Sequence, residues 1–168
     1  ATVKNKNAVL KFLTPKKKAK TLNVEETSVP KIDILETNNR VPWSGHMASY
    51  AIRDIYQKIK KSSLTIVFVN TRAQAELVFN KLWQENDNNL RIAIHHGSLE
   101  KEIRRKVESL MSLGKIDCVV ATSSLDLGID WGDVDLVIQI GSPKGISRFL
   151  QRIGRSNHKF DEPSNAIL

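Results

Sequence analysis

Four short apolar segments, separated by stretches of helical periodicity, constrain the fold of this chain more than any other feature. They cover residues 64–69, 91–95, 116–121 and 134–140, and the first reads LTIVFV. Continuous apolar runs of this length are typical of strands that are buried on both faces, as in parallel sheets. Parallel neighbours need a crossover connection, which is usually a helix. The pattern therefore predicts an α/β fold, with a parallel sheet and helices on both of its faces.

Apolar residues spaced three and four apart mark the helices between these strands. They predict helices over residues 47–60 and 72–84 and a third helix that ends at Gly114. The last helix carries Ile146, Phe149, Leu150 and Ile153 on its inner face.

Length and composition fit one domain with an appendage. The 168 residues are 40% hydrophobic and 26% charged, which is enough apolar material for a packed core. No apolar run reaches the ~18 residues of a membrane span, and the single Cys118 excludes an internal disulfide. His46 and His95 lack the spacing of metal ligands. We therefore expect a soluble, intracellular protein with no metal site of its own and no membrane partner.

Residues 1–41 are predicted to form a lysine-rich connector ahead of a domain over residues 42–168. Eight lysines and two acidic residues lie before position 32, so this arm contributes most of the net charge of +8. Apolar runs at 8–13, 22–25 and 32–35 predict two or three short edge strands in it. The lysines can attract phosphate backbones, but a solvated linker explains them equally well.

The loops that follow the predicted strands are the expected ligand site, because open α/β sheets bind ligands beyond the carboxyl ends of their strands. These loops are residues 70–72, 95–98, 122–130 and 141–145. The sequence has no G-x-x-x-x-G-K-[ST] cradle and no paired Asp-Glu at a strand end. The chain alone therefore lacks a complete site for phosphoryl transfer.

The sequence QRIGRSNH is the strongest candidate for chemistry. Gln151, Arg155 and His158 fall at i, i+4 and i+7 of the last helix, next to Arg148 and Arg152. Forked guanidinium groups that face a cleft suit a polyphosphate whose charge grows in the transition state. Gly154 inside this helix costs about 1 kcal/mol, which predicts a close approach to its backbone. A basic, solvated helix face explains the pattern equally well.

The segment ATSSLDLGID leaves a predicted strand and presents hydroxyls, then carboxylates. Thr122 and Ser123 suit phosphate oxygens, and Asp130 suits a sugar hydroxyl. Ordinary capping of a short helix is the alternative explanation.

Taken in order, TIVFVNTR, HG, ATSSLDLGID and QRIGR resemble motifs IV, IVa, V and VI in the second RecA-like domain of superfamily 2 helicases. The segments PWSGHM, VNTRAQAE, HHGSL and SLDLGIDWGDVD are similar to the Lhr-like group, and most closely to the bacterial ligase-associated DExH-box helicases. The resemblance covers residues 42–168, and four ordered motifs are far more specific than one.

The resemblance implies a RecA-like domain that is one half of an ATP-dependent DNA helicase or translocase. ATP and Mg²⁺ would be held mainly by a first RecA-like domain of the same polypeptide, which this chain lacks. We expect a single-stranded DNA partner, an association with DNA ligase and repair proteins, and a location in the bacterial cytoplasm at the nucleoid. The alanine start and the incomplete ATP site predict that the chain is part of a longer protein.

The resemblance also implies roles for individual residues. Arg155 would be the main arginine finger, and many superfamily 2 members have a second arginine where this chain has His158. The implied catalytic residues are Gln151, Arg152, Arg155 and His158. The implied nucleotide-binding residues are Gly128, Asp130, Arg152 and Arg155. The implied nucleic-acid-binding residues are Asn70, Thr71, Arg72, His96, Gly97, Thr122 and Ser123.

Two alternative functions are compatible with the same residues. The same module can belong to an RNA-directed helicase, because contacts to phosphates carry little information about the sugar. It can also be a non-catalytic module that only binds nucleic acid.

Overall fold

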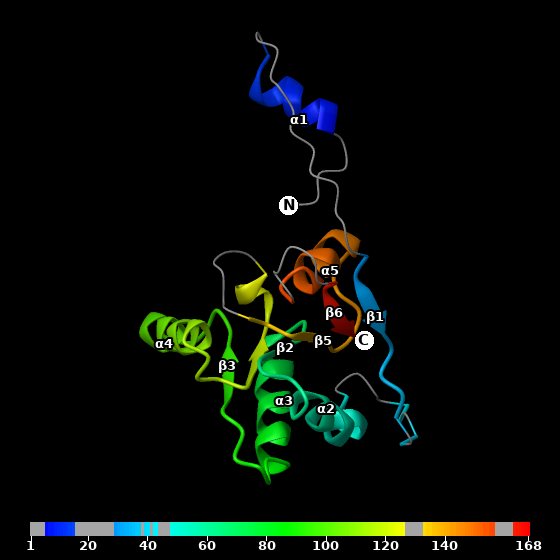
Figure 1. Ribbon diagram of the computed structural model, residues 1–168, viewed down its shortest axis with the longest axis vertical. Coiled ribbons are helices and arrows are strands. Elements are labelled where there is room, and N and C mark those ends of the chain that lie inside the picture. Colours follow the sequence, from blue (N-terminus) through cyan, green and yellow to red (C-terminus); the bar gives the residue numbers. More distant parts are fainter. Residues whose placement is uncertain are drawn as a thin grey trace.

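A six-stranded parallel sheet in the order β1-β6-β5-β2-β4-β3 organises the protein in this computed structural model (Figure 1). The structure describes residues 6–15, 29–37, 39–40, 42–43, 48–126, 133–156 and 163–168. The strands are β1 (Lys31–Asp33), β2 (Thr65–Phe68), β3 (Ile92–His95), β4 (Cys118–Ala121), β5 (Leu136–Gln139) and β6 (Asn165–Ile167). The predicted α/β fold with a parallel sheet is confirmed.

Five α-helices and two short 3₁₀ helices are described. They are α1 (Lys6–Leu13), η1 (Ser49–Ala51), α2 (Ile52–Ile59), α3 (Arg72–Gln84), α4 (Lys101–Ser112), η2 (Ser123–Leu125) and α5 (Ile146–Ile153). Helix α3 has the predicted bounds, and its N-cap Thr71 accepts a hydrogen bond from the backbone N–H of Gln74. The helix predicted over residues 47–60 is divided into η1 and α2.

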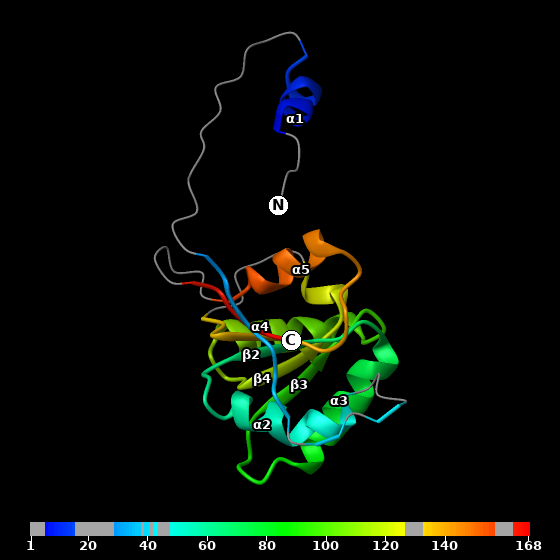
Figure 2. The ribbon, with the colours of Figure 1, turned by 90° about the vertical axis from the view of Figure 1, so that its right-hand side faces the viewer.

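Alternate residues of the strands point into two separate hydrophobic layers. Val67 and Val120 pack with α2 and α3 on one face of the sheet. Ile66 and Phe68 pack with α4 and η2 on the other face. Helix α5 lies on this second face, because the Arg152 guanidinium stands 4.7 Å from the centre of the Phe68 ring. Figure 2 shows the sheet between α5 and the pair α2 and α3.

The central strand β2 aligns the neighbouring strands that carry the site. In register, Phe68 is the partner of Ala121 on β4 and of Gln139 on β5. On the far side of β4, Ala121 is also the partner of His95 on β3. All four strands therefore end at one level, and the loops that follow them meet at one edge of the sheet.

The amino-terminal arm differs from the prediction. The run at residues 8–13 is helical, not an edge strand, because its apolar residues recur at the helical spacing of three and four. The run at 22–25 lies outside the described residues. The run at 32–35 does contribute an edge strand, since β1 pairs with β6 from Lys31 to Asp33. The boundary between connector and domain at residue 42 stays a prediction.

Two features near the carboxyl-terminal end differ from the prediction, which included no strand after the last helix. Strand β6 is only three residues long, and it places Ala166 beside Val137 of β5. The prediction that Gly154 lies inside a helix is wrong, because α5 ends at Ile153 and Gly154 caps it. A Cβ atom at Gly154 would lie 3.3 Å from the carbonyl oxygen of Leu150, so the close approach comes from its own helix.

Among the described residues, no helix is both long enough and apolar enough to cross a membrane.

Candidate functional site

The strand-end loops come together as predicted, and hydrogen bonds join them across the sheet. The Asn70 side chain follows β2 and donates to the carbonyl of Ser142, which follows β5, at 2.8 Å. The backbone N–H of Thr122, after β4, donates to the carbonyl of His95 at the end of β3, at 3.2 Å. These bonds link the four loops pairwise, so the strands set the relative positions of the loops.

Asn70, Thr71 and Arg72 occupy the turn from β2 into α3. The Asn70 backbone N–H donates to the Gln74 side chain at 3.1 Å, which closes the turn. The Arg72 guanidinium reaches across to the loop after β3 and donates to the Ser98 hydroxyl at 2.8 Å. Arg72 and Thr71 are exposed, so both can contact a ligand from solvent.

His96 lies beside this turn with a buried imidazole. Its Nε2 is 2.8 Å from an Oε1 of Glu76, which projects from the second turn of α3. Nδ1 is buried and has no hydrogen-bond partner among the described residues. Gly97 is exposed, and a Cβ atom there would meet nothing within 4 Å. The predicted contacts of His96 and Gly97 with nucleic acid stay predictions.

His95 ties three elements together beneath the loops, although sequence analysis gave it no role. Its Nδ1 lies 2.7 Å from the hydroxyl of Ser124 in η2, and its Nε2 lies 3.0 Å from Glu108 on α4. The Ser124 hydroxyl also donates to the His95 carbonyl at 2.9 Å. Burial lowers the pKa of His95, with Arg104 acting in the same direction, and outweighs the opposite effect of Glu108.

Thr122 and Ser123 lie at the exit of β4, as predicted. Thr122 has an extended backbone and precedes η2, whose first residue is the exposed Ser123. The Ser123 carbonyl accepts from the backbone N–H of Asp126 at 3.2 Å, which folds the loop back towards α5. The loop that carries the two hydroxyls therefore leads directly to the arginines of α5.

Asp126 is the acceptor on which three arginines meet. Its buried carboxylate accepts from Nε of Arg152 at 2.8 Å and forms an ion pair with Nε of Arg148 at 3.2 Å. Its carbonyl oxygen accepts from Nη2 of Arg155 at 3.0 Å. Two guanidinium groups thus share the carboxylate of Asp126, and a third binds its carbonyl oxygen.

Arg152 is held from several sides and only 2% of its side chain is exposed. Besides Asp126, its Nη1 donates to the Gln139 side chain at 2.8 Å, and its guanidinium lies over the Phe68 ring. Gln139 is oriented in turn by donating to the carbonyl of Gly141 at 2.8 Å. Arg152 therefore fixes α5 over the ends of β2 and β5.

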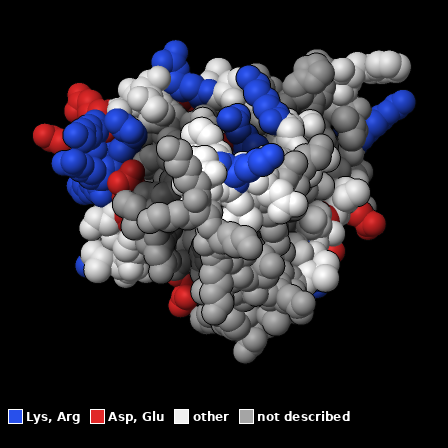
Figure 3. Space-filling model, turned by 90° about the horizontal axis from the view of Figure 1, so that it is seen from above, with Lys and Arg blue, Asp and Glu red and all other residues white. Residues whose placement is uncertain are grey.

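Figure 3 shows the molecule from the side of α5, and Lys and Arg side chains gather over the upper half of this view, with Asp and Glu mostly towards its rim. Gln151 is half-buried. The predicted site residues Gly128, Asp130 and His158 lie outside the described residues. No group of three or more His, Cys, Asp or Glu that could hold a metal occurs in the described part of the chain.

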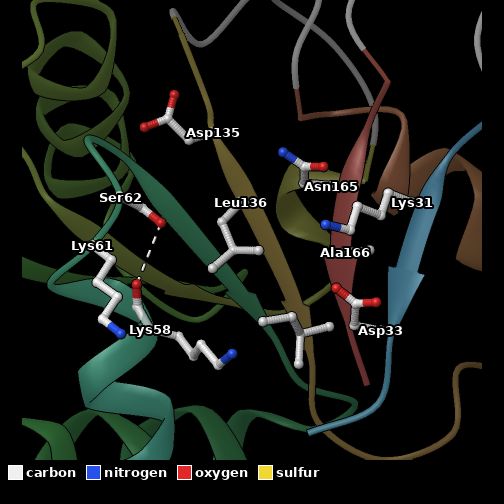
Figure 4. A pocket seen from close by; sticks show the side chains of 10 residues that line it. Lys31, Asp33, Lys58, Lys61, Ser62, Asp135, Leu136, Asn165 and Ala166 are labelled. Atoms are coloured by element: carbon white, nitrogen blue, oxygen red, sulfur yellow. Dashed lines mark hydrogen bonds between the residues drawn. The ribbon is translucent and has the colours of Figure 1, made fainter.

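A pocket of about 470 Å³ lies beside the end of α2, along β1, β6 and the start of β5 (Figure 4). It is lined by all three residues of β6, by Lys31 and Asp33 of β1, by Asp135 and Leu136, and by exposed lysines of and after α2. Its charges are mixed, and none of the predicted site residues lines it. The candidate site is therefore the strand-end surface together with α5.

Residues 48–158 match the family model described as "Helicase conserved C-terminal domain". The chain belongs to this family. An ATP-dependent helicase Lhr-Core protein 2 of Thermococcus barophilus is 43% identical over 111 residues, which are 66% of this chain and 13% of that protein. The predicted Lhr-like resemblance is thereby confirmed, and this helicase domain spans about an eighth of that relative's length.

Solved structures place the helicase domain in the same fold. The structure of Mycobacterium smegmatis helicase Lhr bound to ssDNA and AMP-PNP matches it with a TM-score of 0.82 and 31% identity, over 100% of this chain and 23% of that one. The structure of Saccharomyces cerevisiae Dbp5 bound to RNA and ADP BeF3 has a TM-score of 0.72 at 20% identity and covers 99% of this chain and 43% of that one. The RecA-like prediction for the fold is confirmed.

Several residues that hold the helicase domain's site together were missed from sequence. Asp126 lies within a quoted motif but received no role, although it accepts from or pairs with three arginines. Gln139 could have been noticed, because it is the one polar residue in the segment LVIQI at 136–140. Ser142 and Ser98 carried none, since their contacts with Asn70 and Arg72 depend on the sheet order.

Proposed function

We propose that this domain is the second motor domain of an ATP-dependent DNA helicase or translocase. It binds the backbone of single-stranded DNA and supplies Arg155 to an ATP held mainly by a first RecA-like domain of the same polypeptide. The observation that carries the proposal is the convergence of three arginines on Asp126, four residues after Thr122. Asp126 thereby connects the loop of Thr122 and Ser123, proposed to bind nucleic acid, to α5, proposed to bind the phosphates of ATP.

The charge of this cluster suits a nucleotide's phosphates. Arg148 and Arg152 pair with the Asp126 carboxylate and Arg155 binds its carbonyl oxygen, so three positive charges surround one negative charge. Arg155 is permanently charged and part-buried, which suits a group that stabilises charge developing during phosphoryl transfer. Gln151 and His158 are proposed to complete this surface, and Gly128 and Asp130 to face the nucleotide. Arg152 contributes to the same site from beneath, by holding Asp126.

The nucleic-acid surface is proposed to run over the other strand ends. Backbone N–H groups, hydroxyls and an exposed guanidinium are what phosphates bind, and they give little sequence preference. The proposed contacts are Asn70, Thr71, Arg72, His96, Gly97, Thr122 and Ser123. Closure of the two domains on ATP, and reopening after hydrolysis, would move the protein along the strand.

DNA is favoured over RNA because the more similar of the two nucleic-acid-bound neighbours is the Lhr helicase with ssDNA, at 31% identity. The neighbour with RNA is only 20% identical and indicates the fold alone. A DNA-repair role beside DNA ligase, and a place at the bacterial nucleoid, are proposed on the resemblance to the ligase-associated helicases. Binding of dT and rU oligonucleotides of equal length to the domain tests the choice, and tighter rU binding would favour the RNA-directed alternative.

The isolated chain should not hydrolyse ATP, because the motifs that cradle the phosphates and hold Mg²⁺ are missing from its sequence. Release of phosphate from ATP should equal the buffer control, with or without single-stranded DNA. A protein with both motor domains serves as the positive control. Measurable DNA-stimulated hydrolysis by the isolated chain would contradict the division of the ATP site between two domains. No hydrolysis by the two-domain protein would favour the non-catalytic binding module.

A further inference from the structure

The arginines of α5 differ in how firmly each is held, and this separates their roles. Arg152 is buried between Asp126, Gln139 and the ring of Phe68. Arg148, one turn earlier on the same helix, is 43% exposed and has a single ion pair with Asp126. We infer that Arg148, and not Arg152, joins Arg155 in direct contact with phosphate oxygens; this rests on the proposed function.

Charge balance explains why Arg148 can leave Asp126 at low cost. Arg152 and Asp126 already form a neutral, buried pair whose separation would leave a charge without a partner. Arg148 adds a second cation to a carboxylate that is already neutralised. Its half-exposed ion pair is of the kind that contributes little to stability. An incoming phosphate can therefore replace Asp126 as the partner of Arg148 while Arg152 stays in place.

The positions of Arg148 and Arg155 in the sequence also support a shared role in binding phosphate. Residues seven apart on a helix lie on nearly the same face, two turns away from one another. Arg148 and Arg155 have this spacing, with Arg155 in the tighter turn that follows the end of α5, where its N–H donates to the carbonyl of Arg152. Both guanidinium groups reach Asp126, one at its carboxylate and one at its carbonyl. They are thus brought close together by a single residue.

The phosphate can come from a nucleotide or from the backbone of a nucleic acid. Asp126 lies between the two proposed surfaces, since it follows the loop of Thr122 and Ser123 and contacts α5. Forked guanidinium groups bind either kind of phosphate, often through two hydrogen bonds at once. The shared chemistry is a phosphate oxygen bound by Arg148, and the experiment below distinguishes the two sources.

Titration of the isolated 168-residue chain, followed by NMR of the arginine Nε–H groups, tests this directly. The probes are sodium tripolyphosphate and a dT oligonucleotide, at low ionic strength because exposed charges are screened by salt. The signals of Arg148 and Arg155 should shift with at least one probe, and the Arg152 signal should stay in place. The probe that shifts Arg148 identifies the source of the phosphate.

Substitutions provide a second readout. Arg148→Gln should weaken binding of the effective probe about tenfold, as for loss of one charged hydrogen bond. Arg148→Lys should restore only part of it, because an ammonium lacks the fork. Arg53→Gln removes the same charge from an exposed site on α2, across the sheet, and should leave binding unchanged. The urea midpoint of Arg148→Gln should match that of the unaltered chain, since Arg152 still neutralises Asp126.

The outcomes separate this inference from the proposed function. A shift of Arg155 without Arg148, or of Arg152 in place of Arg148, would overturn the inference and leave the proposed function standing. No shift of any arginine with either probe would also overturn the inference, whereas the proposed function is tested separately by the ATPase rate of a protein with both motor domains. An equal loss of probe affinity in Arg148→Gln and Arg53→Gln would mean that only the net charge of the domain matters, and it would also overturn the inference.

Discussion

The guanidinium of Arg152 and the carboxylate of Asp126 meet 2.8 Å apart beneath α5, with 2% and 6% of the two side chains exposed. The pair connects α5, which is followed by the proposed finger Arg155, to the loop that carries the proposed contacts of Thr122 and Ser123 with nucleic acid. Because Arg152 belongs to the helix and Asp126 to the loop, loss of either side chain should disturb the position of both elements. Its integrity should therefore affect folding and activity together.

Asp126→Asn should destabilise the domain by about 3–5 kcal/mol, because it leaves Arg152 buried without a counter-charge. Asparagine keeps the size of the side chain and one acceptor oxygen, so loss of charge is the main change. Urea unfolding of the 168-residue chain, followed by circular dichroism, measures the free energy of unfolding. Asp87→Asn, at an exposed position after α3, is the matched control and should stay within about 0.5 kcal/mol.

One result would contradict this prediction. If Asp126→Asn unfolds at the same urea concentration as Asp87→Asn, the ion pair of Arg152 and Asp126 contributes nothing measurable to the free energy of unfolding. The account of Arg152 as a positioning residue would then be wrong.

The buried His95 should make stability depend on pH. Burial lowers its pKa in the folded state, so the unfolded chain binds more protons once the pH falls below the ordinary histidine value of about 6.5. Stability should be fully present above that value and decrease as the pH falls, by at most about 1.4 kcal/mol per pH unit for this one group. Urea unfolding at pH values from 8 to 5 measures the slope.

His95→Gln removes the titrating group while keeping a polar side chain between Glu108 and Ser124. The variant should be less stable at pH 8 and should show a smaller loss between pH 6.5 and 5 than the unaltered chain. An identical slope in both proteins would mean that His95 does not contribute.

The exposed Arg72 should contribute one phosphate contact. Arg72→Ala is expected to weaken binding of single-stranded DNA by a similar factor for every sequence tested. It should also reduce the slope of log K against log salt by about 0.7, the value for one contact on a single strand. Fluorescence anisotropy of labelled dT and mixed-sequence oligonucleotides at several salt concentrations checks this.

Arg105→Ala, at an exposed position on α4, removes the same charge outside the proposed contacts. An equal change in slope for Arg105→Ala and Arg72→Ala would indicate diffuse attraction to the basic surface. A strong preference of the domain for one base sequence would count against tracking along the backbone.

Much of the sheet could be predicted because its strands are apolar on both faces and are separated by clear helical periods. The bounds of α3 follow from such a period and from Thr71, which caps it. Strand β6 could not be predicted, because its three residues, Asn165–Ile167, carry too little pattern. Its pairing depends on long-range contacts with β5 and β1.

The candidate site was predictable as a location but not as a network. Parallel strands place their following loops at one edge, so the positions of Asn70 and Thr122 at that edge follow from the sequence alone. A helical repeat shows that Arg152 and Arg155 are near one another, but not that Arg152 is buried. That burial depends on Gln139 and Phe68, which are distant in sequence and become neighbours only through the register of β2 and β5.

The central claim is that Arg155 completes the ATP site. It is tested most directly by comparing the ATPase rates of Arg155→Ala and His158→Ala in a protein with both motor domains, at saturating single-stranded DNA. Arg155→Ala should reduce turnover roughly 10³–10⁵-fold, as for other arginine fingers, while affinity for the nucleotide falls much less. His158→Ala should cost less, because histidine lacks the permanent charge of arginine. Turnover that survives Arg155→Ala within tenfold would contradict the claim that this domain completes the ATP site through Arg155.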